Sequence, residues 1–150
     1  MTKYDLTKIL PHKPPMILLD DIIDVNLDEK TLSAIFKVYP EKLFYDRGIG
    51  GINSLVGIEF MAQTIGCYAF FKSGSEPPKP GLLLGTRLYD NAVDFFEDGK
   101  DYTVKVHEIF TDEEIVVFDC LIYDDSGNEI ASATINAYQG GDIEGLLKGE

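Results

Sequence analysis

Residues 53–71 constrain the fold more than any other part of the chain, because they form its one long apolar run. Helical residues rise roughly 1.5 Å each, so about twenty of them extend about 30 Å, which is also the thickness of a membrane core. The run contains a single ionisable residue, Glu59, followed one turn later by Gln63. Two helix-weakening glycines, Gly57 and Gly66, interrupt it. In an otherwise polar chain, these features favour the core helix of a soluble protein over a membrane span.

Signals at both ends delimit this helix. Asn53 or Ser54 can accept hydrogen bonds from the unpaired N–H groups of the first turn, directly after the flexible pair at residues 50–51. The segment SGSEPPKPG, residues 73–81, ends the helix because proline cannot continue it. The sequence therefore predicts one helix that is buried on most faces and contains a carboxylate.

The carboxylate of Glu59 needs an explanation, because an isolated buried charge is costly unless it pairs, lies in a cavity or shifts its pKa. Gln63 follows four residues later and so lies on the same helix face. In one interpretation, Glu59 is close to the helix N-terminus, where the helix dipole and solvent stabilise it. In the other, it is a general acid or base, or a water-positioning group, in a pocket wall.

Length and charge restrict the class of protein. The 150 residues are enough for one domain, residues 1–150, and a hydrophobic content of 45% argues against disorder. Because 13 basic residues stand against 26 acidic ones, the net charge of −13 disfavours nucleic acid and anionic membranes as partners. An acidic protein partner would need a local basic patch, for which the candidates are Lys37, Lys42, Arg47 and Arg87.

Neither a metal nor a cofactor is predicted. Cys67 in the apolar helix and Cys120 in an apolar strand pattern are expected to be buried thiols rather than a disulfide or a metal pair. The remaining candidate ligands are His12 and His107, and no clustered Cys/His spacing is present. The chain also has no phosphate-binding glycine-rich loop. Since its N-terminus does not resemble a signal peptide, we expect a cytoplasmic protein.

The rest of the chain is strand-like. Residues 2–10 predict a short amphipathic helical turn, residues 16–26 one or two strands, residues 30–40 a half-buried strand and residues 41–51 a loop. Four further strand-like segments follow the helix, at residues 81–95, 102–111, 113–125 and 128–139. Two of the breaks between them, at residues 111–112 and 124–128, look like hairpin turns.

Consecutive strands with short turns usually form an antiparallel meander, and one helix lying across such a curved sheet is an α+β arrangement. From its sequence the chain resembles a hot-dog fold. Because a sheet of this kind covers one side of the helix, we expect a second copy or a paralogue to cover the other side, and therefore a dimer.

Two motifs carry a family resemblance. LPHKPPMILLDDIIDV, residues 10–25, resembles the opening signature of the β-hydroxyacyl-(acyl carrier protein) dehydratases, and GIEFMAQTIG, residues 57–66, resembles their central-helix signature. Later stretches, GLLLGTRLYD, FDCLIYDDSG and NAYQ, are similar to a divergent subgroup associated with aryl-polyene-type pigment and lipid pathways. The resemblance extends from about residue 10 to residue 139.

This resemblance implies an activity and a set of roles. The substrate class is a 3-hydroxyacyl thioester on an acyl carrier protein, and loss of water gives the 2-enoyl thioester without a cofactor. Glu59 matches the family's helix carboxylate, which assists the hydroxyl, and Gln63 matches the glutamine that supports the site. The implied contacts with the acyl tunnel come from the helix and from an N-terminal loop: Gly66, Phe70, Pro11 and His12. Arg87 and Tyr89 are candidates for the tunnel mouth.

One departure from the family matters as much as the match. Typical members carry a second catalytic residue, the histidine of a His-Phe-Pro-Gly motif, just before the central helix, whereas residues 41–54 of this chain contain no histidine. Three explanations stay open: His12 takes that role, a partner subunit supplies the histidine, or the chain is catalytically reduced. Tyr45 and Asp46 in this loop are more typical of packing and turn residues.

Two other functions compete with an active dehydratase. The chain can be a non-catalytic subunit of a dehydratase heterodimer. It can also be an acyl thioesterase, since a helix carboxylate in a hot-dog fold can direct water at a thioester without any histidine.

Overall fold

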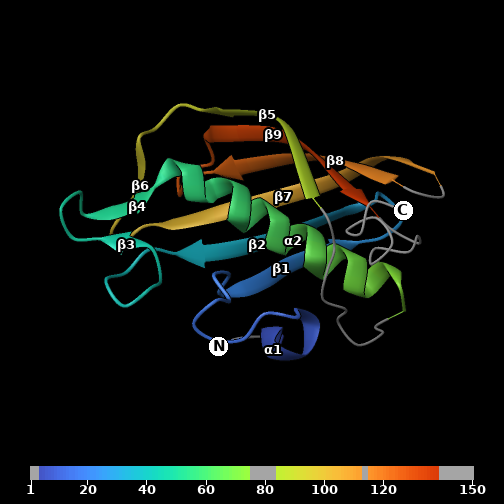
Figure 1. Cartoon of the computed structure of the whole chain (residues 1–150), viewed down its shortest axis with the longest axis horizontal. Coiled ribbons are helices and arrows are strands. Elements are labelled where there is room, and N and C mark those ends of the chain that lie inside the picture. The colour runs from blue at the N-terminus through green and yellow to red at the C-terminus, as the bar shows by residue number, and fades with distance from the viewer. Residues whose placement is uncertain (1–3, 75–83, 113–114, 139–150) are drawn as a thin grey trace, which may run out of the picture.

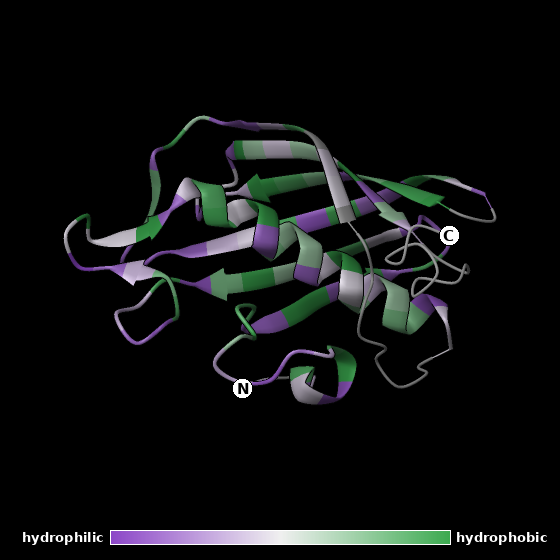
Figure 2. Ribbon diagram, in the orientation of Figure 1, coloured by the Kyte–Doolittle hydropathy of each residue, from purple (hydrophilic) through white to green (hydrophobic). Residues whose placement is uncertain are grey.

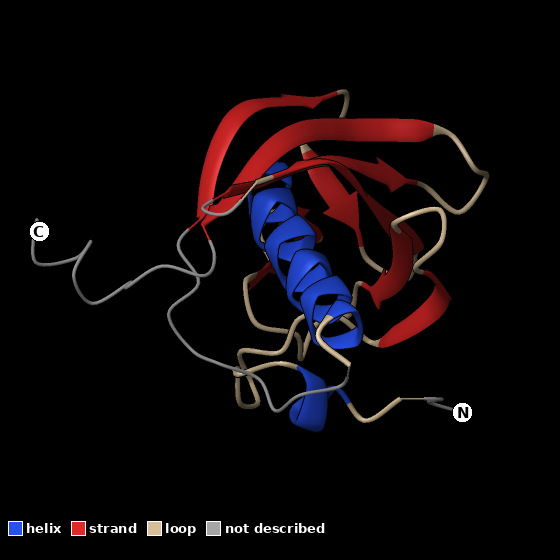
Figure 3. Ribbon diagram, turned by 90° about the vertical axis from the view of Figure 1, so that its right-hand side faces the viewer, coloured by secondary structure: helices blue, strands red, loops and turns tan. Residues whose placement is uncertain are grey.

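A long central helix, α2 (Gly57–Lys72), lies in the concave face of a curved antiparallel sheet (Figures 1 and 3). The computed structural model describes residues 4–74, 84–112 and 115–138. A short 3₁₀ turn, η1 (Ser54–Val56), leads directly into α2. This arrangement of one helix on one curved sheet is the predicted α+β hot-dog fold.

The boundaries of the helical segment follow from local chemistry. The Asn53 side chain accepts a hydrogen bond from the Leu55 N–H at 2.9 Å, so the predicted start is confirmed. At the other end α2 stops at Lys72, and the N–H of Ser73 caps it by donating to Ala69 O at 3.0 Å. By length and composition Ser54–Lys72 also qualifies as a membrane span, but 50% of that window is buried inside the protein, as in a core helix.

Six antiparallel strands form the main sheet in the order β1-β2-β7-β8-β9-β5. They are β1 (Asp21–Asn26), β2 (Thr31–Lys37), β5 (Leu84–Asn91), β7 (Asp101–Thr111), β8 (Ile115–Tyr123) and β9 (Glu129–Tyr138). In β2, in β8 and in residues 102–108 of β7 every second residue is buried, because alternate side chains point toward α2. Figure 2 shows the same alternation of hydrophobic and hydrophilic bands along the strands.

Two details of the topology differ from the sequence-based prediction. The four strand segments after the helix do not all form one meander: β7, β8 and β9 do, but β5 pairs with β9 at the far edge and β7 pairs with β2. The expected loop at residues 41–51 also contains strand residues. There β3 (Tyr45–Asp46) and β4 (Gly51–Asn53) form a small sheet with β6 (Phe95–Glu97), which separates β5 from β7 along the chain.

Aromatic side chains join the helix to the sheets. Phe36 of β2 stacks on Phe60 of α2 with ring centroids 3.7 Å apart, and Phe96 and Tyr102 pack around this pair. Burial of this cluster removes large apolar surfaces from water and is the main source of attraction between helix and sheet.

Both cysteines are free and buried, as the sequence predicted. Burial raises the pKa of the Cys67 thiol to about 12.

The N-terminal segment lies beside α2 near the edge of the sheet formed by β1 (Figure 1). It contains a single helical turn, α1 (Leu6–Ile9), whose first residue follows an Asp5 cap and whose Leu6 and Ile9 side chains are buried. Leu10 is buried as well. The predicted helical turn is therefore confirmed, and the segment after it brings residues 11–18 to the polar face of α2.

Candidate active site

Gln63 organises the polar face of α2, because its buried amide makes three hydrogen bonds. Its Oε1 accepts from the Leu18 N–H at 2.9 Å, and its Nε2 donates to Met16 O at 2.8 Å and to Glu59 Oε1 at 3.2 Å. The amide orientation is settled by its partners, since a backbone N–H can only donate and a carbonyl can only accept. The glutamine thus fixes the N-terminal loop and presents one N–H to the carboxylate.

Glu59 lies in the first turn of α2, where the helix dipole favours a negative charge. Its Oε1 accepts the Gln63 hydrogen bond and lies 3.7 Å from His12 Nε2. Its side chain is 41% exposed in this chain, which agrees with the interpretation of a solvated carboxylate near the helix N-terminus. The reason is the position of Glu59 at the helix start, where the sheet of the same chain does not cover it.

His12 reaches Glu59 from the N-terminal loop and is 31% exposed. Its Nδ1 atom is buried and makes no hydrogen bond within the described part of the chain. Because a carboxylate oxygen faces Nε2, we assign the imidazole proton to Nε2, which leaves Nδ1 as an unpaired acceptor. In this arrangement the histidine is a donor directed at Glu59.

The structure brings three of the predicted site residues together, with Pro11 next to them in the chain, and places Gly66 and Phe70 further along α2. His12, Glu59 and Gln63 form one cluster, and Pro11 is exposed beside it. Gly66 lies further along α2, where an added Cβ would meet Leu10 Cδ2 at 3.0 Å. The nearby Phe70 ring packs against Phe71 with ring centroids 5.2 Å apart. Contact of these residues with an acyl chain stays a prediction.

Tyr89 of β5 contacts the start of the helical segment. Its hydroxyl donates to the Ser54 carbonyl and lies where a side chain at Gly57 would need to be. Burial raises the pKa of Tyr89 to about 12, so the hydroxyl is a neutral donor. The candidate tunnel mouth therefore has Tyr89 bound to the helix start, while the side chain of Arg87 lies outside the described part of the structure.

Lys42, one of the four candidates for a basic patch, is not available for one. Its side chain is only 4% exposed, and its Nζ donates to Leu18 O at 2.7 Å and to Asp20 Oδ2 at 2.5 Å. The partners lie more than twenty residues earlier, so no local pattern reveals the pair. The turn role expected for Asp46 is confirmed, because its carboxylate accepts from the Gly48 N–H at 2.8 Å.

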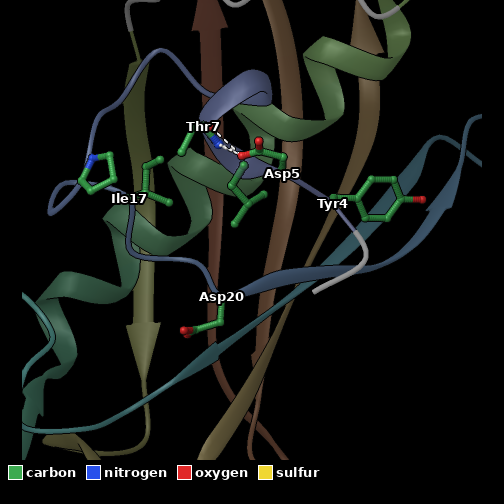
Figure 4. Close-up of a pocket in the computed structure, with 7 residues that line it drawn as sticks. Tyr4, Asp5, Thr7, Ile17 and Asp20 are labelled. Carbon is green, nitrogen blue, oxygen red and sulfur yellow. Dashed lines mark hydrogen bonds between the residues drawn. The ribbon is translucent and has the colours of Figure 1, made fainter. Parts of the chain in front are cut away.

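An open pocket lies on the N-terminal segment (Figure 4). Its lining residues are Tyr4, Asp5, Leu6, Thr7, Pro14, Ile17 and Asp20. None of the three clustered site residues lines it. Its two carboxylates are already engaged, one by the Thr7 N–H at 3.1 Å and the other by Lys42. The pocket is therefore separate from the carboxylate cluster.

A curved antiparallel sheet around one helix, with a carboxylate and a supporting glutamine on that helix, defines a hot-dog-fold protein with a carboxylate site. Residues 4–148 match the ApeP-like family, described as ApeP dehydratase, and the chain belongs to this family.

The chain is also similar to curated dehydratases. It is 33% identical over 98 residues to the 3-hydroxyacyl-[acyl-carrier-protein] dehydratases FabZ of Shewanella sp. (strain W3-18-1) and Shewanella oneidensis. These alignments cover 61% of this chain and 63% of each relative, so the chain spans less than two thirds of the length of the relatives it matches.

Solved structures agree on the fold. The dehydratase heterocomplex ApeI:P from Xenorhabdus doucetiae contains a chain that superposes with a TM-score of 0.83 at 24% identity, with 97% of this chain and 96% of that chain covered. The E. coli PaaI protein from the phenylacetic acid degradation operon has a TM-score of 0.62 at 13% identity, with coverages of 79% and 82%. At these identities the likeness establishes the hot-dog fold alone.

Proposed function

We propose that this chain takes part in the dehydration of a 3-hydroxyacyl thioester carried on an acyl carrier protein, and that it supplies the helix carboxylate Glu59. The observation that carries the proposal is the locked Gln63 amide, which donates to Glu59 Oε1 at 3.2 Å. Because two backbone groups hold the Gln63 amide in place, its hydrogen bond fixes the orientation of a carboxylate that is half-exposed and accessible to a substrate. Membership of the ApeP-like family and similarity to the FabZ enzymes support the same reaction class.

The reaction requires two proton transfers. A base removes a proton from the carbon next to the thioester carbonyl, the C–O bond to the hydroxyl breaks, and an acid protonates the departing hydroxyl to give water. Glu59 assists the hydroxyl in this scheme. The Glu59 carboxyl gives its proton to the departing hydroxyl and takes up a new one from solvent, while the base releases to solvent the proton that it removed. His12 Nε2, 3.7 Å from Glu59 Oε1, faces the carboxylate that forms. Gln63 holds the carboxylate so that it meets the hydroxyl at a fixed angle.

The base for the carbon-bound proton comes, in this proposal, from a partner subunit. Both polar atoms of the His12 ring are unsuited to that task, because Nε2 faces Glu59 and Nδ1 is buried. The loop before α2 has no histidine. A paralogue that retains a histidine before its central helix would complete the site, and a solved relative is itself a dehydratase heterocomplex.

Exposure and charge favour an oligomer with a less acidic partner. Glu59 and His12 are 41% and 31% exposed, and β5, at one edge of the main sheet, has Leu88 60% exposed. A second subunit on this edge would extend the sheet and enclose the site. The net charge of −13 disfavours association with an identical copy relative to a paralogue of lower charge. We further propose one cytoplasmic domain, residues 1–150, without nucleic-acid binding, membrane insertion or a cofactor.

The test compares the purified chain alone with the chain bound to a histidine-bearing paralogue. Conversion of a 3-hydroxyacyl carrier-protein thioester to the 2-enoyl thioester is followed by mass spectrometry. We expect turnover by the pair, loss of it with Glu59→Gln, and unchanged turnover with Glu97→Gln, an exposed carboxylate paired with Lys100 at 2.6 Å. Turnover by the chain alone that His12→Ala abolishes would assign a self-sufficient site. Release of free thiol that depends on Glu59 would replace dehydration by thioester hydrolysis.

A further inference from the structure

We infer that Lys42 is a positioning residue for the Glu59 carboxylate and acts through Leu18 and Gln63. The inference rests on the proposed function in one respect, which is the catalytic role of Glu59. The contacts that carry it are two hydrogen bonds to the same loop residue, Leu18: Lys42 binds its carbonyl and Gln63 binds its N–H.

Lys42 is one of the most enclosed charged residues among those that the structure describes. Its Nζ lies 2.7 Å from Leu18 O and 2.5 Å from Asp20 Oδ2, and its side chain is 4% exposed. Burial lowers the pKa of Lys42, while the hydrogen bond to Asp20 acts in the opposite direction. The Asp20 carboxylate therefore favours the charged form of the buried ammonium group.

Asp20 connects Lys42 to the rigid sheet. Its backbone N–H donates to Ile35 O of β2 at 2.9 Å, and its Oδ2 accepts from the Lys37 N–H at 2.6 Å. The aspartate is thus held by β2 through both its main chain and its side chain. Because Lys42 binds this carboxylate, the position of its ammonium group is fixed by the sheet as well as by the loop.

Leu18 connects Lys42 to Gln63 and so to the Glu59 carboxylate. Its side chain is fully buried, its carbonyl accepts from Lys42, and its N–H donates to Gln63 Oε1 at 2.9 Å. The same Gln63 amide donates to Glu59 Oε1 at 3.2 Å. A continuous series of hydrogen bonds therefore runs from β2 through Asp20 and Lys42 to the Glu59 carboxylate.

Removal of the Lys42 ammonium group leaves the buried Leu18 carbonyl without this donor, whereas the Asp20 carboxylate is 23% exposed and keeps the Lys37 N–H. The loop at residues 16–18 must then shift to reach other donors or water, because unpaired buried acceptors are costly. A shift of this loop moves the Met16 carbonyl and the Leu18 N–H, which orient the Gln63 amide. A reoriented amide makes a weaker hydrogen bond to Glu59.

The experiment uses the chain in complex with its partner subunit and compares Lys42→Met, Gln63→Leu and the double variant. Lys42→Met is expected to lower kcat by roughly 10–100-fold with little change in KM, as losses of supporting hydrogen bonds do. In the double variant kcat should fall no further than in Gln63→Leu alone, because both changes disable one series of contacts. Lys42→Arg should restore part of the activity. Lys100→Met, which removes an exposed lysine paired with Glu97, should leave kcat unchanged.

A second measurement does not depend on activity. In nitrogen–proton correlation spectra, Lys42→Met should move the Leu18 amide and the Gln63 side-chain resonances, and Lys100→Met should not. If Lys42→Met does not fold, the variant Lys42→Met with Asp20→Asn removes both charges together and serves in its place.

The outcomes separate the two proposals. Additive losses of kcat, or unmoved Gln63 resonances, overturn the role of Lys42 while leaving the role of Glu59 intact. Full activity of the Glu59→Gln complex overturns the proposed function, and with it any catalytic role for Lys42. In that case, shifts of the Leu18 and Gln63 resonances in Lys42→Met would show only that Lys42 supports the structure of this loop.

Discussion

Replacement of the Gln63 amide by a carboxylate, Gln63→Glu, is expected to make stability fall as the pH rises. The new side chain keeps one oxygen that accepts from the Leu18 N–H, but its second oxygen faces Met16 O and Glu59 Oε1, which the wild-type Nε2 approaches at 2.8 and 3.2 Å. The substitution thus replaces the N–H donor of Gln63 by an oxygen acceptor, which faces two other acceptors, Met16 O and Glu59 Oε1.

The contact distances set the size of the effect. Two unit charges about 3 Å apart repel by about 1 kcal/mol in a water-like dielectric and about 5 kcal/mol at a dielectric of about 20. Because Glu59 is 41% exposed, screening favours the lower end, and we expect about 1–2 kcal/mol. The repulsion raises the folded-state pKa of the introduced carboxyl above its unfolded value, so the native state binds more protons. The variant therefore loses stability as the pH rises above about 4.

The assay is urea unfolding between about pH 4 and pH 7, with Gln63→Leu as the matched variant that has no titratable group. Gln63→Leu leaves the buried Leu18 N–H unpaired and should cost about 1–3 kcal/mol at every pH. Combination of Gln63→Glu with Glu59→Gln should reduce the pH dependence, and burial of the introduced carboxyl beside Met16 O accounts for the part that remains. A pH-independent loss in Gln63→Glu would refute the hydrogen bond from Gln63 to Glu59.

Three further outcomes are expected. Gly57→Ala should destabilise the fold by roughly 1–3 kcal/mol, because the added methyl meets the Tyr89 hydroxyl; partial rescue by Tyr89→Phe in thermal unfolding would support this and a silent Gly57→Ala would contradict it. Burial raises the pKa of Glu108 and its hydrogen bond with Lys72 lowers it, with a net value below the ordinary 4.5. Its stabilising contribution is therefore present above about pH 4.5 and lost on further acidification. The urea midpoint of Glu108→Gln should accordingly fall less on acidification than that of the wild type. The same pH dependence of the midpoint in both proteins would speak against the buried pair. The Cys67 thiol should react with alkylating reagents only on unfolding, as mass spectrometry of native and unfolded protein can establish, and rapid native labelling would disprove its burial.

The sequence was most informative where the cause of structure is local. Asn53 caps the helical segment and the prolines beyond Ser73 exclude its continuation, so the limits of the central helix were predictable. The four-residue spacing of Glu59 and Gln63 placed them on one face, and their hydrogen bond confirms it. Alternating residues in β2, β7 and β8 predicted half-buried strands.

Features that depend on distant pairing escaped prediction. β5 lies beside β9, and β6 pairs with β4 in the second sheet before the chain enters β7 beside β2. Lys42 looked like any surface lysine, because its partners become neighbours only after folding. For Glu59 the sequence left burial and solvent exposure open, because a helix pattern alone does not reveal which distant residues cover a side chain.

The most direct test of the central claim is the rate of water loss from a 3-hydroxyacyl carrier-protein thioester by the two-subunit complex when only this chain carries Glu59→Gln. The account predicts that turnover stops although the partner is intact and the complex still forms. An unchanged rate would contradict it, because the carboxylate held by Gln63 would then have no part in the reaction.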